Sequence, residues 1–138
     1  MPDTSEHAHS HSTLAFGRLY ADEAGESHFG ALSMEMTERS FAPPAPAFWV
    51  SPMSEAARQG FLVVPAGWVG DLHPSPARMW IIVLDGEMEF QASDGERRSL
   101  VPGSALLLED TTGKGHRSHV VGGLVATLAM VQMPAYSS

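Results

Sequence analysis

The stretch that decides the fold runs from Gly67 to Gly86 and reads GWVGDLHPSPARMWIIVLDG. It ends in an apolar, β-prone run from Met79 to Leu84, which an Asp-Gly turn signal closes. Side chains alternate across a strand, so the odd-numbered residues of this run face one way and the even-numbered ones, Trp80 among them, face the other. Both faces are apolar. The strand is therefore expected to be covered on both sides, by another segment of the chain or by a second subunit, and we favour a homodimer.

The charge balance narrows the choice of partners. The 138 residues include 8 Lys and Arg against 16 Asp and Glu, for a formal net charge of −8. Phosphate backbones and anionic lipid surfaces repel such a field. The close basic pair Arg97-Arg98 is flanked by Asp94 and Glu96. We predict neither a nucleic-acid partner nor a membrane partner. The chain has no cysteine, which excludes disulfides and thiolate ligands.

The N-terminal stretch MPDTSEHAHSHS has neither the basic start nor the apolar run of a secretory signal. The run from Met79 to Leu84 is too short to cross a bilayer. We therefore predict a cytoplasmic protein. Residues 1–13 are expected to form a flexible His- and Ser-rich tail. In an extended chain His7, His9 and His11 lie on one side and could take up a stray divalent ion.

Short apolar runs bounded by Gly, Pro and Asp extend beyond this stretch, a pattern typical of strands and turns. The expected strands are Leu14–Tyr20, Phe29–Met36, Ala47–Ser51, Phe61–Pro65, Met79–Leu84, Glu87–Ala92, Arg97–Val101, Ala105–Glu109, His116–Val121 and Leu124–Met133. In residues 51–60, Ser51 can cap, Pro52 can begin and Gly60 can end a short helix. We predict an all-β fold with at most one or two short helical turns.

Tight turns are expected to join the strands between residues 79 and 108 into a four-stranded meander. Ser93-Asp94-Gly95 favours a type I′ hairpin, which needs positive φ at its central residues. Pro102-Gly103 fits the second and third positions of a type II turn. Asp85-Gly86 indicates a further sharp bend or bulge.

The spacing of residues 67–86 resembles the first motif of the cupin superfamily: Gly, five residues, His-x-His, three or four residues, Glu, six residues, Gly. Here Gly67 is followed after five residues by His73, and every later interval is kept. Ser75 stands where the second histidine belongs, and Met79 stands where the glutamate belongs. The chain is similar in particular to small single-domain bacterial cupins, with degenerate metal-binding motifs.

A second stretch, residues 103–120, resembles the other cupin motif. Gly113, Lys114, Gly115 and His116 reproduce its Gly-x-x-His portion, while Thr111 replaces a proline and Val120 an asparagine. Gly103 can serve as its opening glycine. The resemblance implies a cupin-type double-stranded β-helix, the jelly-roll barrel, formed as a single domain by residues 14–138.

In metal-binding cupins three histidines and a glutamate hold a divalent ion, and this chain keeps two of those positions, His73 and His116. Catalytic sites usually supply three protein ligands and an open position. The resemblance therefore implies a divalent transition metal (Fe, Mn, Ni or Zn) that is held weakly or not at all. His119 could supply a ligand only if a bulge reversed its face; His28 and Glu26 are further candidates.

The expected ligand pocket is lined by Trp68, Asp71, His73, Ser75, Met79, Ile81, His116 and Ser118. We favour a cupin whose cavity binds a small molecule without a full set of metal ligands. The alternative is an enzyme acting on a small polar metabolite through His73 and His116. Such an enzyme would be a metal-assisted oxygenase, or an isomerase, epimerase or lyase with a histidine base. Histidine suits proton transfer because the free side chain titrates near neutral pH.

A histidine base is usually oriented by a carboxylate. Asp71 could orient His73, and Glu109 or Asp110 could orient His116; the spacing leaves these pairings open. Lys114, between two glycines, could attract an anionic substrate to the mouth of the barrel.

Overall fold

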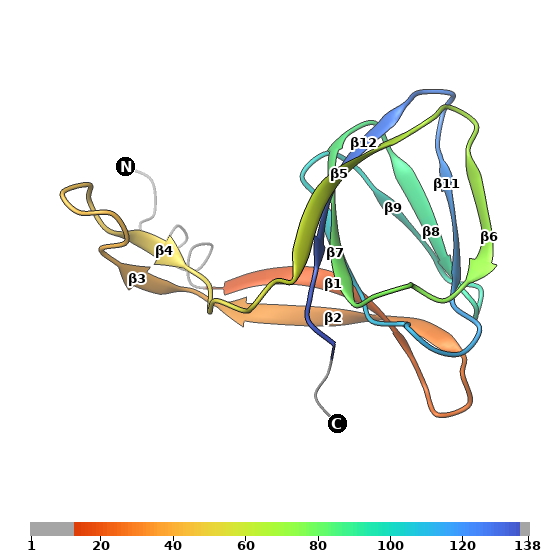
Figure 1. Ribbon diagram of the computed structural model, residues 1–138, viewed down its shortest axis with the longest axis horizontal. Helices are drawn as coiled ribbons and strands as arrows, with labels where there is room; N and C mark the ends of the chain where they lie inside the picture. Colours follow the sequence, from red (N-terminus) through yellow and green to blue (C-terminus); the bar gives the residue numbers. More distant parts are fainter. Residues whose placement is uncertain (1–12, 136–138) are drawn as a thin grey trace, which may run out of the picture. The chain divides into compact units, whose positions relative to one another are not determined.

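The computed structural model describes residues 13–135, which form strands, turns and loops (Figure 1). In chain order the strands are β1 (Thr13–Ala21), β2 (Ser27–Glu35), β3 (Thr37–Arg39), β4 (Phe48–Val50), β5 (Arg58–Val64), β6 (Val69–His73), β7 (Met79–Asp85), β8 (Met88–Ala92), β9 (Arg97–Leu100), β10 (Ala105–Leu108), β11 (His116–Val120) and β12 (Ala126–Gln132). The all-β prediction is confirmed. No helix in the described range is long and apolar enough to cross a membrane. Residues 1–12, with the predicted tail and its histidines, lie outside this range.

The chain divides into two compact units. Within the described range, the smaller one comprises residues 13–16 and 31–54. In it β3 and β4 pair antiparallel, with Glu38 opposite Trp49. None of residues 31–54 is buried, and Phe41 and Met53 are largely exposed. A two-stranded hairpin without a buried apolar face has little stability of its own.

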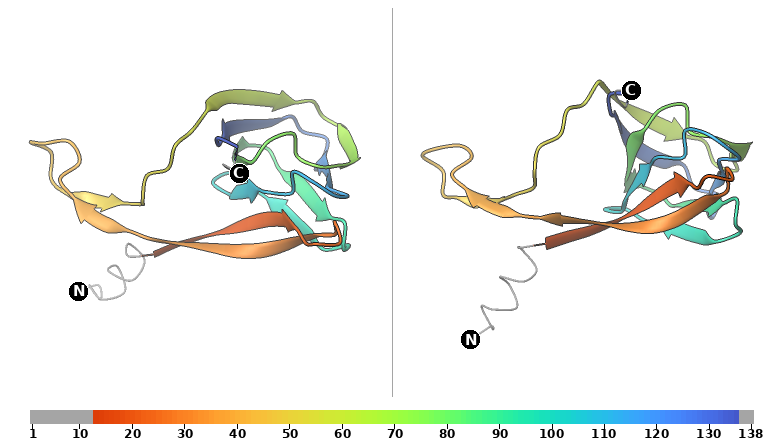
Figure 2. Two further views of the ribbon diagram at one scale, coloured as in Figure 1. Left: turned by 60° about the horizontal axis from the view of Figure 1, so that its bottom comes forward. Right: turned by 90° about the horizontal axis from the view of Figure 1, so that it is seen from below.

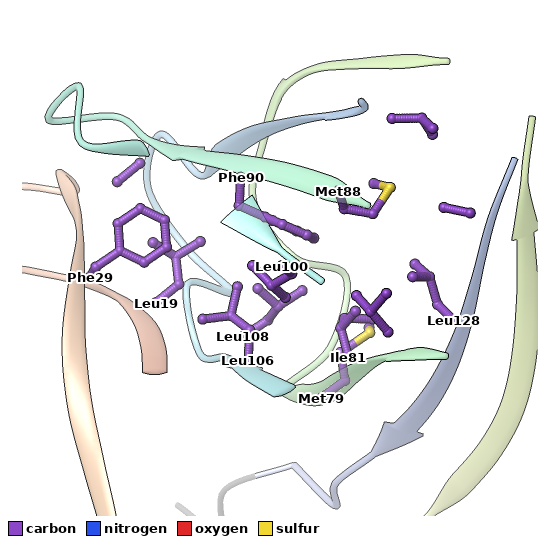
Figure 3. Close-up of a cluster of buried hydrophobic side chains, with 14 residues drawn as sticks. Leu19, Phe29, Met79, Ile81, Met88, Phe90, Leu100, Leu106, Leu108 and Leu128 are labelled. Carbon is purple, nitrogen blue, oxygen red and sulfur yellow. The ribbon is translucent and has the colours of Figure 1, made fainter. Parts of the chain in front are cut away.

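The larger unit comprises residues 17–30 and 55–135 of the described chain and holds two sheets. Their strand orders are β2-β1-β10-β7-β12-β5 and β6-β11-β8-β9. Figures 1 and 2 show the strands of this unit curving around one interior. The hydrophobic core lies there, with side chains from both sheets (Figure 3). This is the arrangement expected of a jelly-roll barrel.

Strand β7 shows the predicted alternation. Met79, Ile81 and Val83 are buried, whereas Trp80 is half-buried and Leu84 is exposed. The odd-numbered face therefore belongs to the core. The even-numbered face is less covered, and its covering by a second subunit stays a prediction.

The expected meander is wrong, because β7 and β10 belong to one sheet whereas β8 and β9 belong to the other. Strand β7 pairs with β10 and β12, while β8 pairs with β9 and β11. The bend at Asp85-Gly86 thus carries the chain from one sheet to the other. Only the hairpin between β8 and β9 joins neighbours of one sheet in this stretch.

The turn chemistry is right at one site and wrong at another. At Pro102-Gly103 the type II turn is confirmed: Gly103 has φ 93°, and the Ser104 amide donates to the Val101 carbonyl at 2.8 Å. The type I′ turn is wrong, since Gly95 has φ 100° but no non-glycine residue in the described range has positive φ. The Gly95 amide donates to the Ala92 carbonyl, so a turn followed by one left-handed glycine closes this hairpin.

The helical turn expected within residues 51–60 is also wrong. Residues 51–57 form a loop, and β5 begins at Arg58. The Ala57 amide donates to the carbonyl of Gln132, and β5 then pairs with β12 over its whole length. Sheet pairing takes up the backbone groups that a short helix would have used.

Candidate functional site

A cavity of about 480 Å³ lies within the larger unit. Its walls are Phe61, Leu62, Val63, Val64, Pro65, Trp68, His73, Ser75, Pro76, Met79, Ile81, Met88, Phe90, Leu108, His116, Ser118, Leu128 and Met130. The polar side chains of this lining are two histidines and two serines. The cavity is therefore an apolar chamber in which the polar groups are few.

The pairing of β6 with β11 brings the two motif histidines together. His73 and His116 lie opposite each other in the antiparallel register, and their ring centroids are 5.2 Å apart. The His116 ring also lies 5.5 Å from the ring of Phe90 on the neighbouring strand β8. The register shifts between His116 and Ser118, yet both stay buried, while His119 is partly exposed. His119 is absent from the lining, as the alternation predicts.

His116 forms a buried pair with a carboxylate. Its Nδ1 lies 2.6 Å from Oδ2 of Asp110, and the side chains are 4% and 0% exposed. The second carboxylate oxygen, Oδ1, has no hydrogen-bond partner among the described residues. The Asp110 backbone carbonyl accepts a hydrogen bond from the Ser75 amide at 2.9 Å. The loop between β10 and β11 is thus tied to the segment that follows His73.

Of the two carboxylates left open by the sequence, Asp110 orients His116. Glu109 instead contacts two arginines, with Arg18 Nε at 2.7 Å and Arg78 Nε at 3.0 Å from its two oxygens. Neighbouring side chains of an extended chain point in opposite directions, so the side chains of Glu109 and Asp110 lie on opposite sides of the barrel wall.

His73 is oriented by a backbone group. Its Nδ1 lies 2.6 Å from the carbonyl oxygen of Asp71. The expected partnership with the Asp71 carboxylate is not formed, and Asp71, an exposed residue, is absent from the cavity lining. A carbonyl oxygen only accepts, so Nδ1 of His73 carries a hydrogen in this contact.

The other expected pocket residues, Trp68, Ser75, Met79, Ile81 and Ser118, all line the cavity. The Ser75 hydroxyl donates to the Ala77 carbonyl at 2.7 Å. A Cβ at Gly70 would lie 2.4 Å from the Trp68 indole, which shows how closely that ring lies over β6.

The walls from β5 and β12 were missed by the sequence analysis. They contribute residues such as Leu62, Val64, Leu128 and Met130. In β5 the consecutive residues 61–64 all line the cavity, so alternation gave no signal there. In β12 alternation was the available signal, since Leu128 is buried whereas Ala129 is only half-buried. It becomes useful only when the strands are known to be paired.

The side chains of residues 13–135 offer few ligands for the metal that the cupin resemblance implies. No group of three or more His, Cys, Asp or Glu side chains that could hold an ion occurs within residues 13–135. Ser75 hydrogen-bonds a backbone carbonyl, and Asp110 is already bound to His116. Two imidazoles without a third strong donor do not fit a three-ligand site. A weakly held ion at His73 and His116 stays a prediction.

The remaining candidates, Glu26, His28 and Lys114, lie in two loops and at the start of β2, and none of them lines the cavity. Lys114 Nζ lies 2.8 Å from a carboxylate oxygen of Glu26, and the Ser93 hydroxyl donates to the same carboxylate at 2.8 Å. These contacts lower the pKa of Glu26 and raise that of Lys114. The Lys114 ammonium is therefore engaged in the fold, which weakens the expectation that it attracts an anionic substrate.

His28, the second residue of β2, bridges two carboxylates of the neighbouring loops. Its ring nitrogens lie 2.7 Å from Asp22 and 2.9 Å from Asp94. The hydrogen bond with Asp22, followed by that with Asp94, raises the pKa of His28 above its ordinary value of 6.5. The stabilisation from this pair is fully present below the unfolded pKa, and is lost as the pH rises through the folded pKa.

We expect the His28 ring to titrate above pH 6.5 when followed by NMR. Asp94→Asn should lower the midpoint, because one of the carboxylates that hold the imidazolium is removed. Asp71→Asn changes an exposed carboxylate on β6 and serves as the control, with no expected shift. An unchanged midpoint in Asp94→Asn would contradict the bridge.

No protein-family model matches the sequence, and no curated protein matches it significantly. Among solved structures, the chain is similar to a cupin 2 conserved barrel domain protein from Salinispora arenicola. That likeness has 17% identity and a TM-score of 0.49, and covers 74% of this chain and 76% of the other. The chain is also similar to the cupin domain of Schizosaccharomyces pombe Cnp3, with 14% identity, a TM-score of 0.44, and coverage of 93% and 88%.

A conserved protein of unknown function from Streptococcus pyogenes is similar at 21% identity and a TM-score of 0.44, with coverage of 59% and 70%. Likeness at these identities concerns the course of the chain and carries no activity with it. The fold follows from the molecule's own strands: two facing sheets enclose one core, and the histidines of the two motif-like stretches meet across β6 and β11. By this strand arrangement, the chain has the cupin-type β-barrel fold that its sequence predicted.

Proposed function

We propose that the barrel cavity binds a small molecule with an apolar body and one polar end, held by hydrogen bonds rather than by a metal ion. The observation that carries this proposal is the cavity itself: about 480 Å³, walled by apolar side chains, with His73 and His116 side by side. Small-molecule pockets in proteins typically measure about 300–1,000 Å³ and combine apolar walls with a few convergent polar groups.

A second candidate function is proton transfer on the bound molecule. The buried contact between His116 and Asp110 at 2.6 Å supports it, because a carboxylate that fixes an imidazole is a common part of acid–base sites. A histidine-based isomerase, epimerase or lyase needs only a proton moved from one atom of the substrate to another. This chemistry requires no co-reactant, and it uses the same cavity as simple binding.

Binding can be tested by thermal shift with a set of sugars, organic acids and aromatic compounds. A compound at a hundred times its Kd should add about 2.7 kcal/mol to the free energy of unfolding. Val64→Phe is expected to abolish this effect, because Val64 lines the cavity and a larger side chain there fills it. Val69→Phe is the matched control, since Val69 is exposed and is absent from the lining.

Failure of every compound, or an equal shift in Val64→Phe, would contradict the proposal. Elemental analysis of the same preparations should find less than one metal ion per chain. One Fe, Mn, Ni or Zn per chain, lost in His73→Ala, would show that a metal holds the ligand instead.

A further inference from the structure

We infer that the two histidines form a hydrogen-bond donor and acceptor pair, in which His116 donates from Nε2 and His73 accepts at Nε2, so that the site recognises a neutral carboxamide. This inference rests on the proposed binding function and names its ligand class. It follows from the different partners of the two rings: a buried carboxylate for one and a backbone carbonyl for the other.

The burial of Asp110 determines which ring nitrogens of His116 carry a hydrogen. This carboxyl group is 0% exposed, and His116 is its one side-chain partner within the described chain. The arginines Arg18 and Arg78 contact Glu109. An unpaired carboxylate in such a place is very costly, so the His116–Asp110 pair holds the proton that neutralises it.

The proton can lie on the His116 ring or on the Asp110 carboxyl group, and in both cases Nε2 of His116 carries a hydrogen. If Asp110 is ionised, His116 is an imidazolium and carries hydrogens on both ring nitrogens. If Asp110 is a neutral acid, its hydrogen lies on Oδ2 and is donated to Nδ1, because a hydrogen on the buried Oδ1 would have no acceptor among the described residues; the neutral ring then carries its one hydrogen on Nε2. In either case Nε2 of His116 is an N–H donor, and no described residue accepts from it.

His73 offers a hydrogen-bond acceptor to the ligand, where His116 offers a donor. Its Nδ1 must carry a hydrogen, because the Asp71 carbonyl only accepts. No carboxylate within residues 13–135 lies at salt-bridge distance from the His73 ring. If His116 is an imidazolium, a positive charge on His73 would lie beside it, with 5.2 Å between the two ring centroids. A neutral His73 with its hydrogen on Nδ1 presents a lone pair at Nε2.

A carboxamide matches this pair, because its carbonyl oxygen accepts and its adjacent N–H donates. A carboxylate offers two acceptors and no donor. The described lining also contains no Lys or Arg to balance an anion. The apolar wall, with the aromatic side chains of Phe61, Trp68 and Phe90, suits an aromatic body on the carboxamide. Benzamide is thus the simplest probe of the predicted class.

The ring hydrogens can be observed directly by long-range ¹H–¹⁵N NMR of the histidine side chains at pH 7, without a ligand. His73→Gln and His119→Gln assign the signals and leave the buried pair intact. We expect a protonated Nε2 in His116, and in His73 a protonated Nδ1 with a bare Nε2. A bare Nε2 in His116 or a protonated Nε2 in His73 would overturn the inference.

Matched ligands test the class. Benzamide should bind about five- to tenfold more tightly than acetophenone, which has the same shape but no N–H donor, because one hydrogen bond is lost. Benzamide should also bind more tightly than benzoate. His73→Leu should bring benzamide and acetophenone to the same affinity. Equal affinities in the unchanged protein, or a preference for benzoate, would overturn the carboxamide class.

The two experiments separate this inference from the proposed function. If the NMR pattern is as expected and none of the three compounds binds, the carboxamide class is overturned, while the ring assignment stands. The wider compound set then decides whether the cavity binds small molecules at all. If other compounds of that set bind in a Val64-dependent way, the proposed function survives without the ligand class.

Discussion

Replacing Gly115 by alanine is expected to lower the free energy of unfolding by about 3–5 kcal/mol. Gly115 has φ 79°, a left-handed conformation that costs other L-residues about 1–2 kcal/mol. A Cβ there would also lie 2.0 Å from the backbone carbon and oxygen of His73. Backbone atoms cannot turn aside as a flexible side chain can, so β6 and β11 must separate. Urea unfolding followed by circular dichroism measures the loss.

Gly67→Ala is the matched control, because Gly67 has the same φ of 79° but nothing within 4 Å of the Cβ position. Gly67→Ala should lower the free energy of unfolding only by the cost of the left-handed conformation, about 1–2 kcal/mol. The difference between the two variants then reports the close approach of Gly115 to His73. Equal losses in the two variants would show that β6 and β11 do not meet as described.

Replacing His116 by leucine is expected to destabilise the protein by about 3–5 kcal/mol, although leucine has a similar volume. The change leaves Asp110 fully buried without its hydrogen-bond partner. His73→Leu is the control. His73 is exposed and its Nδ1 contact is to a backbone carbonyl, so the loss should be about 1 kcal/mol or less.

The double variant Asp110→Leu/His116→Leu completes a thermodynamic cycle for the buried pair. Removing both partners takes away the unpaired group, so the double variant should be more stable than His116→Leu alone. Chemical denaturation of the four proteins supplies the numbers. Additive losses would show that the two side chains are not coupled, and would remove the basis for the donor at Nε2 of His116.

Local patterns predicted most of the strands, because such patterns depend on neighbouring residues; β3 and β6 were not among the expected strands. The alternation in Met79–Leu84 put Met79 and Ile81, both expected in the pocket, on one face of β7, and Pro102-Gly103 identified the turn between β9 and β10. Asp85-Gly86 was misread because the same dipeptide closes a hairpin or carries a chain between sheets. The choice depends on distant pairings, such as β7 with β12. The helical turn expected within residues 51–60 likewise does not form, because β5 pairs with β12 instead.

For the candidate site, the positions of the two histidines were predictable from the sequence, but the groups that orient them were not. The resemblance to the two cupin motifs predicted that His73 and His116 lie close together, and the strand register places them opposite each other. The orienting groups were harder to predict. The choice between Glu109 and Asp110 depends on Arg18, a residue 91 positions away from Glu109 along the chain. The partner of His73 is a backbone carbonyl, and side-chain patterns carry no information about such a group.

The parallel pairing of β1 with β10 bears on how the protein is made. Gly17 lies opposite Leu106, a separation of 89 residues (106 − 17). Proteins rich in such non-local pairings fold slowly, because a long loop must close before the contact forms. At about 5–20 residues per second of synthesis, β1 leaves the ribosome several seconds before its partner exists. The barrel therefore closes only after β10 and β12 have been synthesised.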